Sequence, residues 1–175
     1  MRHNTHILFS LLMLIGIYEI FPVLNRINPF PYAVFFAILG SLLPDIDHPR
    51  AFISRGYWSI LSTLIRKTTE HRGWTHSLLG AGLFTGILLV ILWYFKASLS
   101  LALGFFVGYI SHLISDSFNP TGVNWLWPKR KRYKIGIIRT GSTGENIFMW
   151  IILFTIVGLL YYDIVYNSGC LLKYR

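Results

Sequence analysis

The chain contains five long apolar stretches, and these stretches constrain its fold more than any other feature. A helix needs about 20 consecutive apolar residues to cross a lipid bilayer. The five stretches are close to that length, and they cover residues 7–24, 27–43, 78–95, 97–114 and 147–166. They predict an all-α fold, a polytopic membrane bundle of about five helices. Because no repeat or low-complexity tract divides the chain, residues 1–175 are expected to form a single domain.

The charge content favours lipid as the solvent. Charged residues make up 13% of the chain and apolar residues 54%, whereas a soluble domain carries about 25% charged residues. A soluble core could absorb the apolar residues, but too few charges would remain to cover the surface. The single cysteine, Cys170, excludes an internal disulfide and a cysteine-based zinc cluster.

The first two stretches contain residues that interrupt a helix. The first follows a basic start and has the length of a signal peptide, but no clean small-residue cleavage site follows it. Glu19 and Pro22 interrupt its far end, so we expect an uncleaved helix. Pro29 and Pro31 break the second stretch, which is therefore predicted to be either a short span or a re-entrant segment.

The third and fourth stretches are predicted to pack as close neighbours. Lys96 alone separates them, so the two helices must run antiparallel. Small residues allow helix backbones to approach closely in membranes. Five glycines in these stretches are expected to serve this purpose: Gly80, Gly82, Gly86, Gly104 and Gly108.

The basic residues divide unequally between the two ends of the stretches. With five crossings, twelve of the 16 Lys and Arg residues fall on the side of the N-terminus and of the two long polar segments, 44–77 and 116–146. Cytoplasmic loops are enriched in Lys and Arg, so this side is predicted to face the cytoplasm. The formal net charge of +9 favours anionic partners, namely membrane lipid and a phosphate-containing substrate, with nucleic acid as a less favoured alternative.

Histidine and acidic residues gather at the ends of the apolar stretches. In the five-crossing topology the following residues all lie at the cytoplasmic face: His6, Asp45, Asp47, His48, His71, His76, His112, Asp116 and Glu145. His112 and Asp116 are four residues apart and share one helix face. An ionisable side chain within a spanning helix costs roughly 2.5–3.5 kcal/mol at the bilayer centre, so both residues need a partner. A metal ion would be such a partner, and a simple hydrogen-bonded pair is the alternative.

The number and type of these residues predict a site for more than one metal ion. The predicted ligands are His6, Asp45, Asp47, His71, His76, His112, Asp116 and Glu145. A single catalytic zinc uses about three protein ligands and a water, so this larger set suits two or three divalent ions. Imidazole and carboxylate ligands without thiolate favour zinc, with manganese or iron as alternatives. Paired metals are typical of phosphoester hydrolysis.

Three residues among and beside these ligands are candidates for catalysis. One of Asp47 and His48 is expected to bind metal and the other to support it, while an unligated carboxylate would act as general base. Arg72 lies between two predicted histidine ligands, where it could hold a phosphate together with the basic run at 129–134. Asp47, His48 and Arg72 are therefore the predicted catalytic residues.

Several of these residues occur in motifs that resemble those of a known family. The matching segments are Leu43-Pro44-Asp45-Ile46-Asp47-His48-Pro49 and His71-Arg72-Gly73-Trp74-Thr75-His76-Ser77, with His6 before them and His112 and Asp116 after them. In these motifs the chain resembles the LexA-binding, inner-membrane-associated hydrolases, also called membrane-bound metal-dependent hydrolases. Asn119 departs from the pattern, which has Thr before the following proline. The resemblance implies a metal-dependent hydrolase of the inner membrane but no particular substrate.

The expected function is hydrolysis of a phosphoester bond at the cytoplasmic membrane interface, with a phospholipid as one candidate substrate. Two other classes stay open as alternatives. A metal or ion transporter places its site near the bilayer midplane, where this chain offers few polar residues. A non-catalytic scaffold would use the metal only to join helix ends, and its site would be closed rather than open to a ligand.

Overall fold

The computed structural model describes residues 1–24, 30–49, 51–54, 56–68, 72–129 and 131–166. Within these ranges the regular secondary structure is helical, and an isolated bridge between Val123 and Tyr133 is the one strand-like pairing. The predicted all-α class is confirmed for this part of the chain.

Each of the five apolar stretches forms a helix. The helices are α1 (His3–Ile20), α3 (Phe30–Leu42), α5 (Leu78–Tyr94), α6 (Leu101–Ser117) and α7 (Thr143–Tyr166). α6 begins and ends later than predicted, because Lys96 has a left-handed backbone (φ 54°) and the chain continues through turns before the helix starts. This shift puts both His112 and Asp116 inside the helix.

A sixth helix, α4 (Ser59–Thr68), lies in the polar segment between the second and third stretches, where no helix was predicted. α4 is amphipathic, with Ile60, Leu61 and Leu64 exposed and Ser62 buried. The Ser62 hydroxyl donates a hydrogen bond to the carbonyl of Ile46 (2.7 Å), which attaches α4 to the turn after α3. Four short 3₁₀ helices belong to the same region: η1 (Leu43–Asp47), η2 (Phe52–Ser54), η3 (Gly56–Trp58) and η4 (Trp74–His76).

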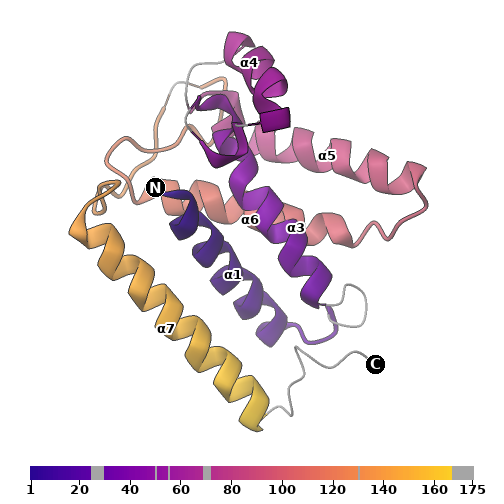
Figure 1. Ribbon diagram of the computed structural model, residues 1–175, viewed down its shortest axis with the longest axis vertical. Helices are drawn as coiled ribbons and strands as arrows, with labels where there is room; N and C mark the ends of the chain where they lie inside the picture. Colours follow the sequence, from indigo (N-terminus) through magenta and orange to yellow (C-terminus); the bar gives the residue numbers. More distant parts are fainter. Residues whose placement is uncertain (25–29, 50, 55, 69–71, 130, 167–175) are drawn as a thin grey trace.

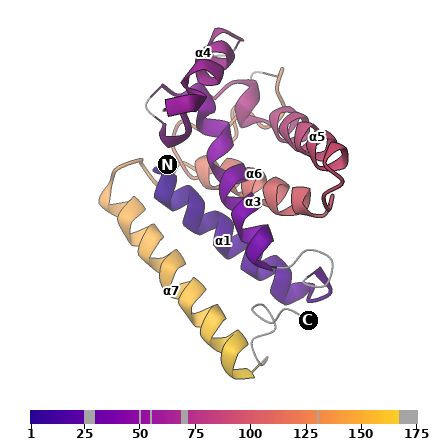
Figure 2. The same cartoon turned by 45° about the vertical axis from the view of Figure 1, so that its right-hand side comes forward.

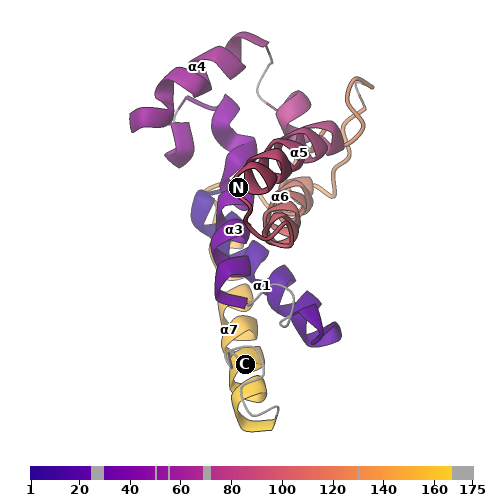
Figure 3. The same ribbon diagram turned by 90° about the vertical axis from the view of Figure 1, so that its right-hand side faces the viewer.

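The five apolar helices fan out from one end of the molecule. Figure 1 shows the N-terminus at this end, near the start of α7, with α1 and α7 running away from it side by side. α3 and α6 run in the opposite chain direction, so their C-terminal ends lie on the side of the N-terminus, as Figure 2 also shows. In Figure 3, α5 and α6 are steeply inclined to α3 and α7. Helix termini therefore converge at one end and spread apart at the other.

α3 and α6 cross with their backbones in contact. A Cβ atom on Gly108 would overlap the backbone of Ala37, and one on Gly104 would lie 2.7 Å from the carbonyl oxygen of Ala33. Small residues thus allow these helices to approach as closely as their main chains permit. The crossing brings the C-terminal end of α6 against the C-terminal end of α3, where the predicted ligands lie.

The glycine prediction is wrong for part of α5. Gly80 does lie in a tight contact, since a Cβ atom there would be 2.5 Å from the carbonyl oxygen of Trp74. At Gly82 and Gly86, however, a Cβ atom would meet no described atom within 4 Å. These two glycines face away from the neighbouring helices, because α5 uses its N-terminal turn, rather than its whole length, for close backbone contact.

Two helical segments are long and apolar enough to cross a bilayer, judged by length and composition alone. They are Phe30–Asp47, which joins α3 and η1, and Thr143–Tyr166, which is α7. α5 and α6 are shorter, at 17 residues each. All five apolar stretches are helical, but the five-crossing topology stays a prediction.

Candidate metal centre

The convergent end of the molecule holds a cluster of imidazole and carboxylate groups. Its members are His6 from α1, Asp45 and Asp47 from η1, His76 from η4, and His112 and Asp116 from α6. We call these six residues the His/Asp cluster. They form three overlapping groups of three, and in each group the ligand atoms lie within 4.8 Å of one another. Segments from four parts of the chain thus bring their metal-binding atoms to one place.

The position of His112 depends on the α3–α6 crossing. Its Nδ1 atom lies 2.6 Å from the carbonyl oxygen of Ser41 on α3. A carbonyl oxygen can only accept a hydrogen bond, so Nδ1 must carry the proton and donate it. In the neutral imidazole the Nε2 atom is then unprotonated, and it points into the cluster with a lone pair that can bind a metal.

His6 is oriented in the same way by a neighbouring hydroxyl group. The Ser115 hydroxyl donates to the carbonyl of His112 (2.9 Å), so its oxygen accepts the hydrogen bond from His6 Nδ1 (2.7 Å). His6 Nε2 is consequently unprotonated, and it makes no hydrogen bond with any described residue although it is buried. The ring stacks on that of His112 with 3.8 Å between centroids. A buried nitrogen lone pair without a hydrogen-bond donor is well suited to bind a metal ion.

His76 completes a set of three converging imidazoles. Its Nδ1 atom lies 3.4 Å from Asp47 Oδ2, and its Nε2 atom lies 3.3 Å from His112 Nε2. Burial alone would lower the pKa of His76, but hydrogen bonds to Asp45 and Asp47 outweigh burial and raise the pKa to about 9. A proton on Nε2 of His76 can be donated to the unprotonated Nε2 of His112, and a metal ion could take the place of this proton.

Asp47 mainly orients its neighbours. Its Oδ2 atom accepts hydrogen bonds from the Thr75 hydroxyl (2.8 Å) and from the backbone amide of Arg72 (2.9 Å), in addition to its contact with His76. A carboxylate beside the Nδ1 atom of a histidine fixes the tautomer in which Nε2 faces the metal. Of the two η1 carboxylates, Asp45 is the one closer to Nε2 of His76, at 3.4 Å.

Asp116 already has two cationic partners, Arg72 and the α-ammonium of Met1, and it also lies near the unprotonated Nε2 atom of His6. One carboxylate oxygen lies 2.6 Å from Nη2 of Arg72, and the other lies 2.5 Å from the α-ammonium of Met1 and 3.5 Å from His6 Nε2. All four groups are largely buried. The Asp116 site therefore attracts positive charge, which a divalent ion would also provide.

Arg72 is held in an unusual backbone conformation. Its φ angle is 64°, in the left-handed region that a long side chain rarely adopts. The hydrogen bond from its amide to Asp47 holds this conformation, and the guanidinium then reaches Asp116, the Thr121 hydroxyl and the carbonyl of Gly122. Such backbone strain is typical of functional sites.

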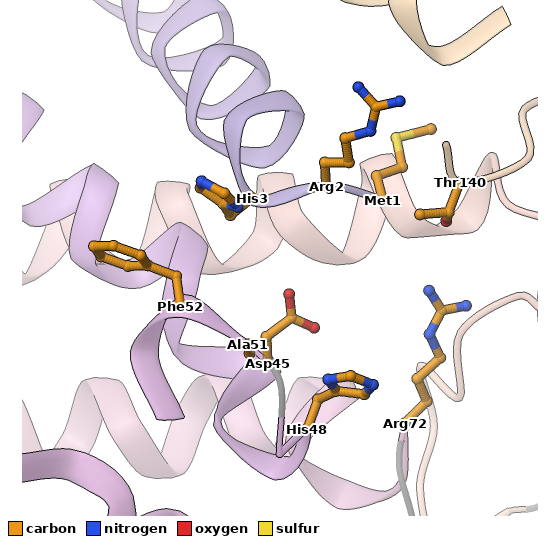
Figure 4. Close-up of a pocket in the computed structure, with 9 residues that line it drawn as sticks. All are labelled: Met1, Arg2, His3, Asp45, His48, Ala51, Phe52, Arg72 and Thr140. Carbon is orange, nitrogen blue, oxygen red and sulfur yellow. The ribbon is translucent and has the colours of Figure 1, made fainter. Parts of the chain in front are cut away.

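A cavity of about 350 Å³ opens beside the cluster. Asp45, His48 and Arg72 line it together with the N-terminal residues, and Figure 4 shows these three side chains directed toward the same space. His48 belongs to none of the ligand groups, but it faces this cavity. Asp45 is the member of the His/Asp cluster that lines this cavity, while the other five members are buried.

One predicted ligand lies elsewhere among the described residues. Glu145 is in none of the ligand groups found among the described residues. It accepts hydrogen bonds from the amide of Arg2 (2.7 Å), the hydroxyl of Thr5 (3.1 Å) and the amide of Gly141 (2.6 Å), and so joins the start of α7 to α1. His71 lies outside the described residues.

The groups that orient the histidines were not predicted. Ser41 acts through its backbone carbonyl, which no side-chain pattern can indicate. Thr75 is next to His76, and Ser115 is three residues from His112. Apart from this proximity, nothing in the sequence indicated that their hydroxyl groups contact histidines. Taken together, the buried lone pairs, the facing Nε2 atoms and the attraction for cations fit a site for divalent metal.

Comparisons with known proteins place the chain among bacterial membrane proteins. It is 40% identical over 162 residues to "Inner membrane protein YdjM" of Escherichia coli (strain K12), covering 86% of this chain and 81% of that protein, with the same values for the Shigella flexneri protein of that name. It is 32% identical over 112 residues to "Uncharacterized protein YvsG" of Bacillus subtilis (strain 168), covering 63% and 67% of the two chains. No solved structure matches. The family model described as YdjM inner membrane protein matches residues 1–170, and the chain belongs to this family.

Proposed function

We propose that the protein is a metal-dependent hydrolase of phosphoester bonds, embedded in the inner membrane with its active site facing the cytoplasm. One observation carries the proposal: three buried imidazoles from three different segments turn their Nε2 atoms toward each other and toward Asp45 and Asp116. Two or three divalent ions would be held by His6, Asp45, His76, His112 and Asp116, with zinc as the first choice and manganese or iron as alternatives.

The protein's own residues would divide the remaining work. A divalent metal in such a site supplies Lewis acidity, which lowers the pKa of water and stabilises negative charge on a phosphoryl oxygen. Asp47 orients His76, as its contacts indicate. Arg72 borders the cavity with a guanidinium that can hold a phosphate oxygen, and His48 faces the same cavity as a group able to move a proton.

The surface around the site supports a membrane setting. α7 is largely exposed although it is strongly apolar, and α4 exposes Ile60, Leu61 and Leu64 beside the basic residues Arg66 and Lys67. An amphipathic helix with an apolar face and basic residues favours the boundary between headgroups and acyl chains. Since α4 is attached to η1, a lipid substrate would meet the protein close to Asp45.

The cavity is the observation that favours an enzyme over a scaffold. A structural metal site is closed by protein ligands, whereas a catalytic one keeps a position open for water and substrate. Asp45 lines the 350 Å³ cavity and also belongs to two ligand groups. Transport is less favoured, because the cluster lies at the ends of helices rather than midway along them.

The test is metal content by elemental analysis of detergent-purified protein. We expect two or more equivalents of zinc or manganese in the wild type, and loss of most of that metal in His112→Ala and Asp45→Ala. Glu145→Gln is the matched control, because this acidic residue lies outside the ligand groups and its substitution should leave metal content unchanged. Wild-type protein that is folded and free of metal, even after incubation with zinc or manganese, would refute the proposal.

Hydrolysis is then tested on a panel of phosphoester lipids with metal-loaded protein. Activity should disappear with a chelator and return when the metal is added back. Arg72→Gln should retain metal but lose most of the activity, because the guanidinium is assigned to the phosphate. Full metal content without activity on any phosphoester would leave the scaffold as the better interpretation.

A further inference from the structure

A second cavity, of about 440 Å³, adjoins the one beside the His/Asp cluster. The two cavities share Arg72 and Thr140 as lining residues. The second cavity is also lined by Arg132, Arg139 and Asn119, and no described acidic residue lines it. We call this cavity the arginine pocket. Three arginines thus line one cavity.

The charges of the arginine pocket are largely uncompensated by the protein. Arg72 has Asp116 as its partner (2.6 Å), but Arg132 and Arg139 are exposed and make no ion pair with any described residue. Like charges around one space repel each other, and an anion between them would remove this repulsion. Guanidinium groups bind phosphate through two parallel hydrogen bonds, which suits them to this anion in particular.

The walls of the arginine pocket are joined by a buried amide. Asn119 Nδ2 donates to the hydroxyl of Thr140 (2.6 Å), while Asn119 Oδ1 accepts from the amide (3.2 Å) and the hydroxyl (3.0 Å) of Thr121. Because the Thr140 oxygen accepts from Asn119, its own proton can be donated to a ligand. The position that departs from the expected motif therefore connects both sides of the pocket.

Arg132 and Arg139 lie on the loop between α6 and α7, which is fixed by backbone hydrogen bonds. Val123 and Tyr133 exchange two such bonds, each 2.9 Å long, and they hold Arg132 beside the turn that follows α6. Gly122 has a φ of +66°, and a Cβ atom there would lie 2.8 Å from the carbonyl oxygen of Tyr133. The two sides of the loop are therefore in backbone contact. The amide of Ile138 donates to the carbonyl of Phe118 (3.0 Å) and fixes the segment next to Arg139.

We propose that the arginine pocket binds a second phosphate group of the substrate, next to the phosphate that faces the His/Asp cluster. The substrate class is then a diphosphate, with Arg72 bordering both phosphate positions. The substrate part of this inference rests on the proposed hydrolase function, but the anion site itself does not require a metal. The diphosphate could belong to a soluble molecule or to the headgroup of a lipid, since the pocket recognises the same chemistry in both.

Calorimetry with metal-free protein tests the site separately from hydrolysis. Inorganic pyrophosphate should bind the wild type at least tenfold more tightly than inorganic phosphate. Arg139→Gln and Arg132→Gln should each weaken pyrophosphate binding tenfold or more. Lys131→Gln is the matched control, because Lys131 is an exposed basic residue of the same loop that lies against the Tyr133 ring (5.3 Å to its centroid) and does not line the pocket. That variant should bind within twofold of the wild type.

Two results would overturn the proposal. Equal weakening by Arg139→Gln and Lys131→Gln would show a general effect of positive charge, as expected for residues that only contact lipid headgroups. Equal affinity for phosphate and pyrophosphate would show a single anion position. Thermal unfolding of each variant separates lost binding from lost folding, because the three replaced side chains are exposed.

Two further arms separate the source of the anion and the role of the metal. Farnesyl diphosphate that binds tenfold more tightly than pyrophosphate would assign the site to a lipid, and equal affinity would assign it to a soluble diphosphate. Pyrophosphate binding that survives in His112→Ala would support the site even if the protein proved to hold no metal. Failure of the hydrolase proposal and failure of the arginine pocket would therefore give different results.

Discussion

α6 and α7 are both apolar helices, yet they use their surfaces in opposite ways. Ten of the 17 residues of α6 are buried, whereas α7 buries four of 24. The buried residues of α6 are mostly small or polar, among them Gly108, Ser111, His112 and Asp116. The exposed residues of α7 are mostly large and apolar, such as Ile151, Phe154 and Val157.

This contrast shows how an apolar solvent reverses the usual pattern of burial. In water, large apolar residues are buried and polar ones are exposed. In lipid there is no hydrophobic gain from packing one apolar helix on another, so small residues and hydrogen bonds decide which faces meet. α6 has these residues and occupies the centre of the molecule, while α7 lacks them over most of its length and remains at the edge.

The largest expected difference concerns two phenylalanines. Phe105 on α6 is 6% exposed and Phe154 on α7 is 69% exposed. Phe105→Ala should lower the free energy of unfolding by about 4 kcal/mol, since it leaves a cavity in the core. Phe154→Ala should change it by less than about 0.5 kcal/mol. Denaturation in detergent micelles measures both, and equal losses would mean that α7 packs as tightly as α6.

The pH dependence of stability should originate at the α6 end of the molecule. Folding raises the pKa of His76, which touches His112, from 6.5 to about 9. The folded protein therefore binds this proton more tightly than the unfolded chain. The stabilisation is fully present below pH 6.5 and is lost as the pH rises through about 9. Metal-free protein should lose on the order of 3 kcal/mol across this window.

The same measurement in His76→Gln is the control. Its stability should be nearly independent of pH between 6.5 and 9, because the titrating group has been removed. A wild-type curve that stays flat over this window would contradict the contacts assigned to His76. Metal should reverse the trend, since a bound ion competes with the proton and binds more tightly as the pH rises.

A matched pair of glycines tests the helix packing. Gly108→Ala should destabilise the protein by about 2 kcal/mol, because the new Cβ overlaps the backbone of Ala37 and forces α3 and α6 apart. Gly158→Ala on α7 meets no described atom within 4 Å and should be neutral, or stabilising by up to about 1 kcal/mol through helix propensity. Thermal unfolding of the two variants under one condition measures both effects. Equal melting temperatures would contradict the close contact of α3 with α6.

The smallest expected effect comes from a pair of hydroxyl groups. Ser115 on α6 and Thr155 on α7 both donate to a carbonyl of the preceding turn, but Ser115 also accepts from His6. Ser115→Ala should weaken metal binding about tenfold, because His6 loses the partner that fixes its tautomer. Thr155→Ala should leave the affinity unchanged. Metal titration against a competing chelator provides the measurement, and equal affinities would argue against the tautomer assignment.

The helices could be predicted from sequence because hydropathy is a local property. Each apolar stretch became a helix, but the start of α6 depended on the turn at Lys96, which composition does not indicate. α4 was missed because it is short and its apolar face alternates with polar residues over only ten positions. Crossing geometry also escaped prediction, since Gly86 and Gly108 are equivalent by composition and differ only in what faces them.

The site was predictable in outline for a similar reason. Topology placed all the candidate ligands at one end, and His6, His76 and His112 do meet there. The same reasoning selected Glu145, which instead joins α7 to α1, because sharing one end of a helix bundle does not determine which side chains touch. The arginine pocket was beyond prediction: of the basic run, Arg132 is the member that lines it, and Arg139 comes from outside the run.

The residues of α6 that pack against α3 and those that belong to the His/Asp cluster lie on one ridge of the helix. This arrangement limits which insertions and deletions the helix can accept. Gly104, Gly108, His112 and Asp116 follow each other at intervals of four, so they lie along a single row of the helix surface. Inserting or deleting one residue between Gly108 and His112 would rotate everything beyond it by about 100° and turn both site residues away from α3. Length variation within α6 should therefore be intolerable, while the exposed part of α7 should accept an added or missing residue.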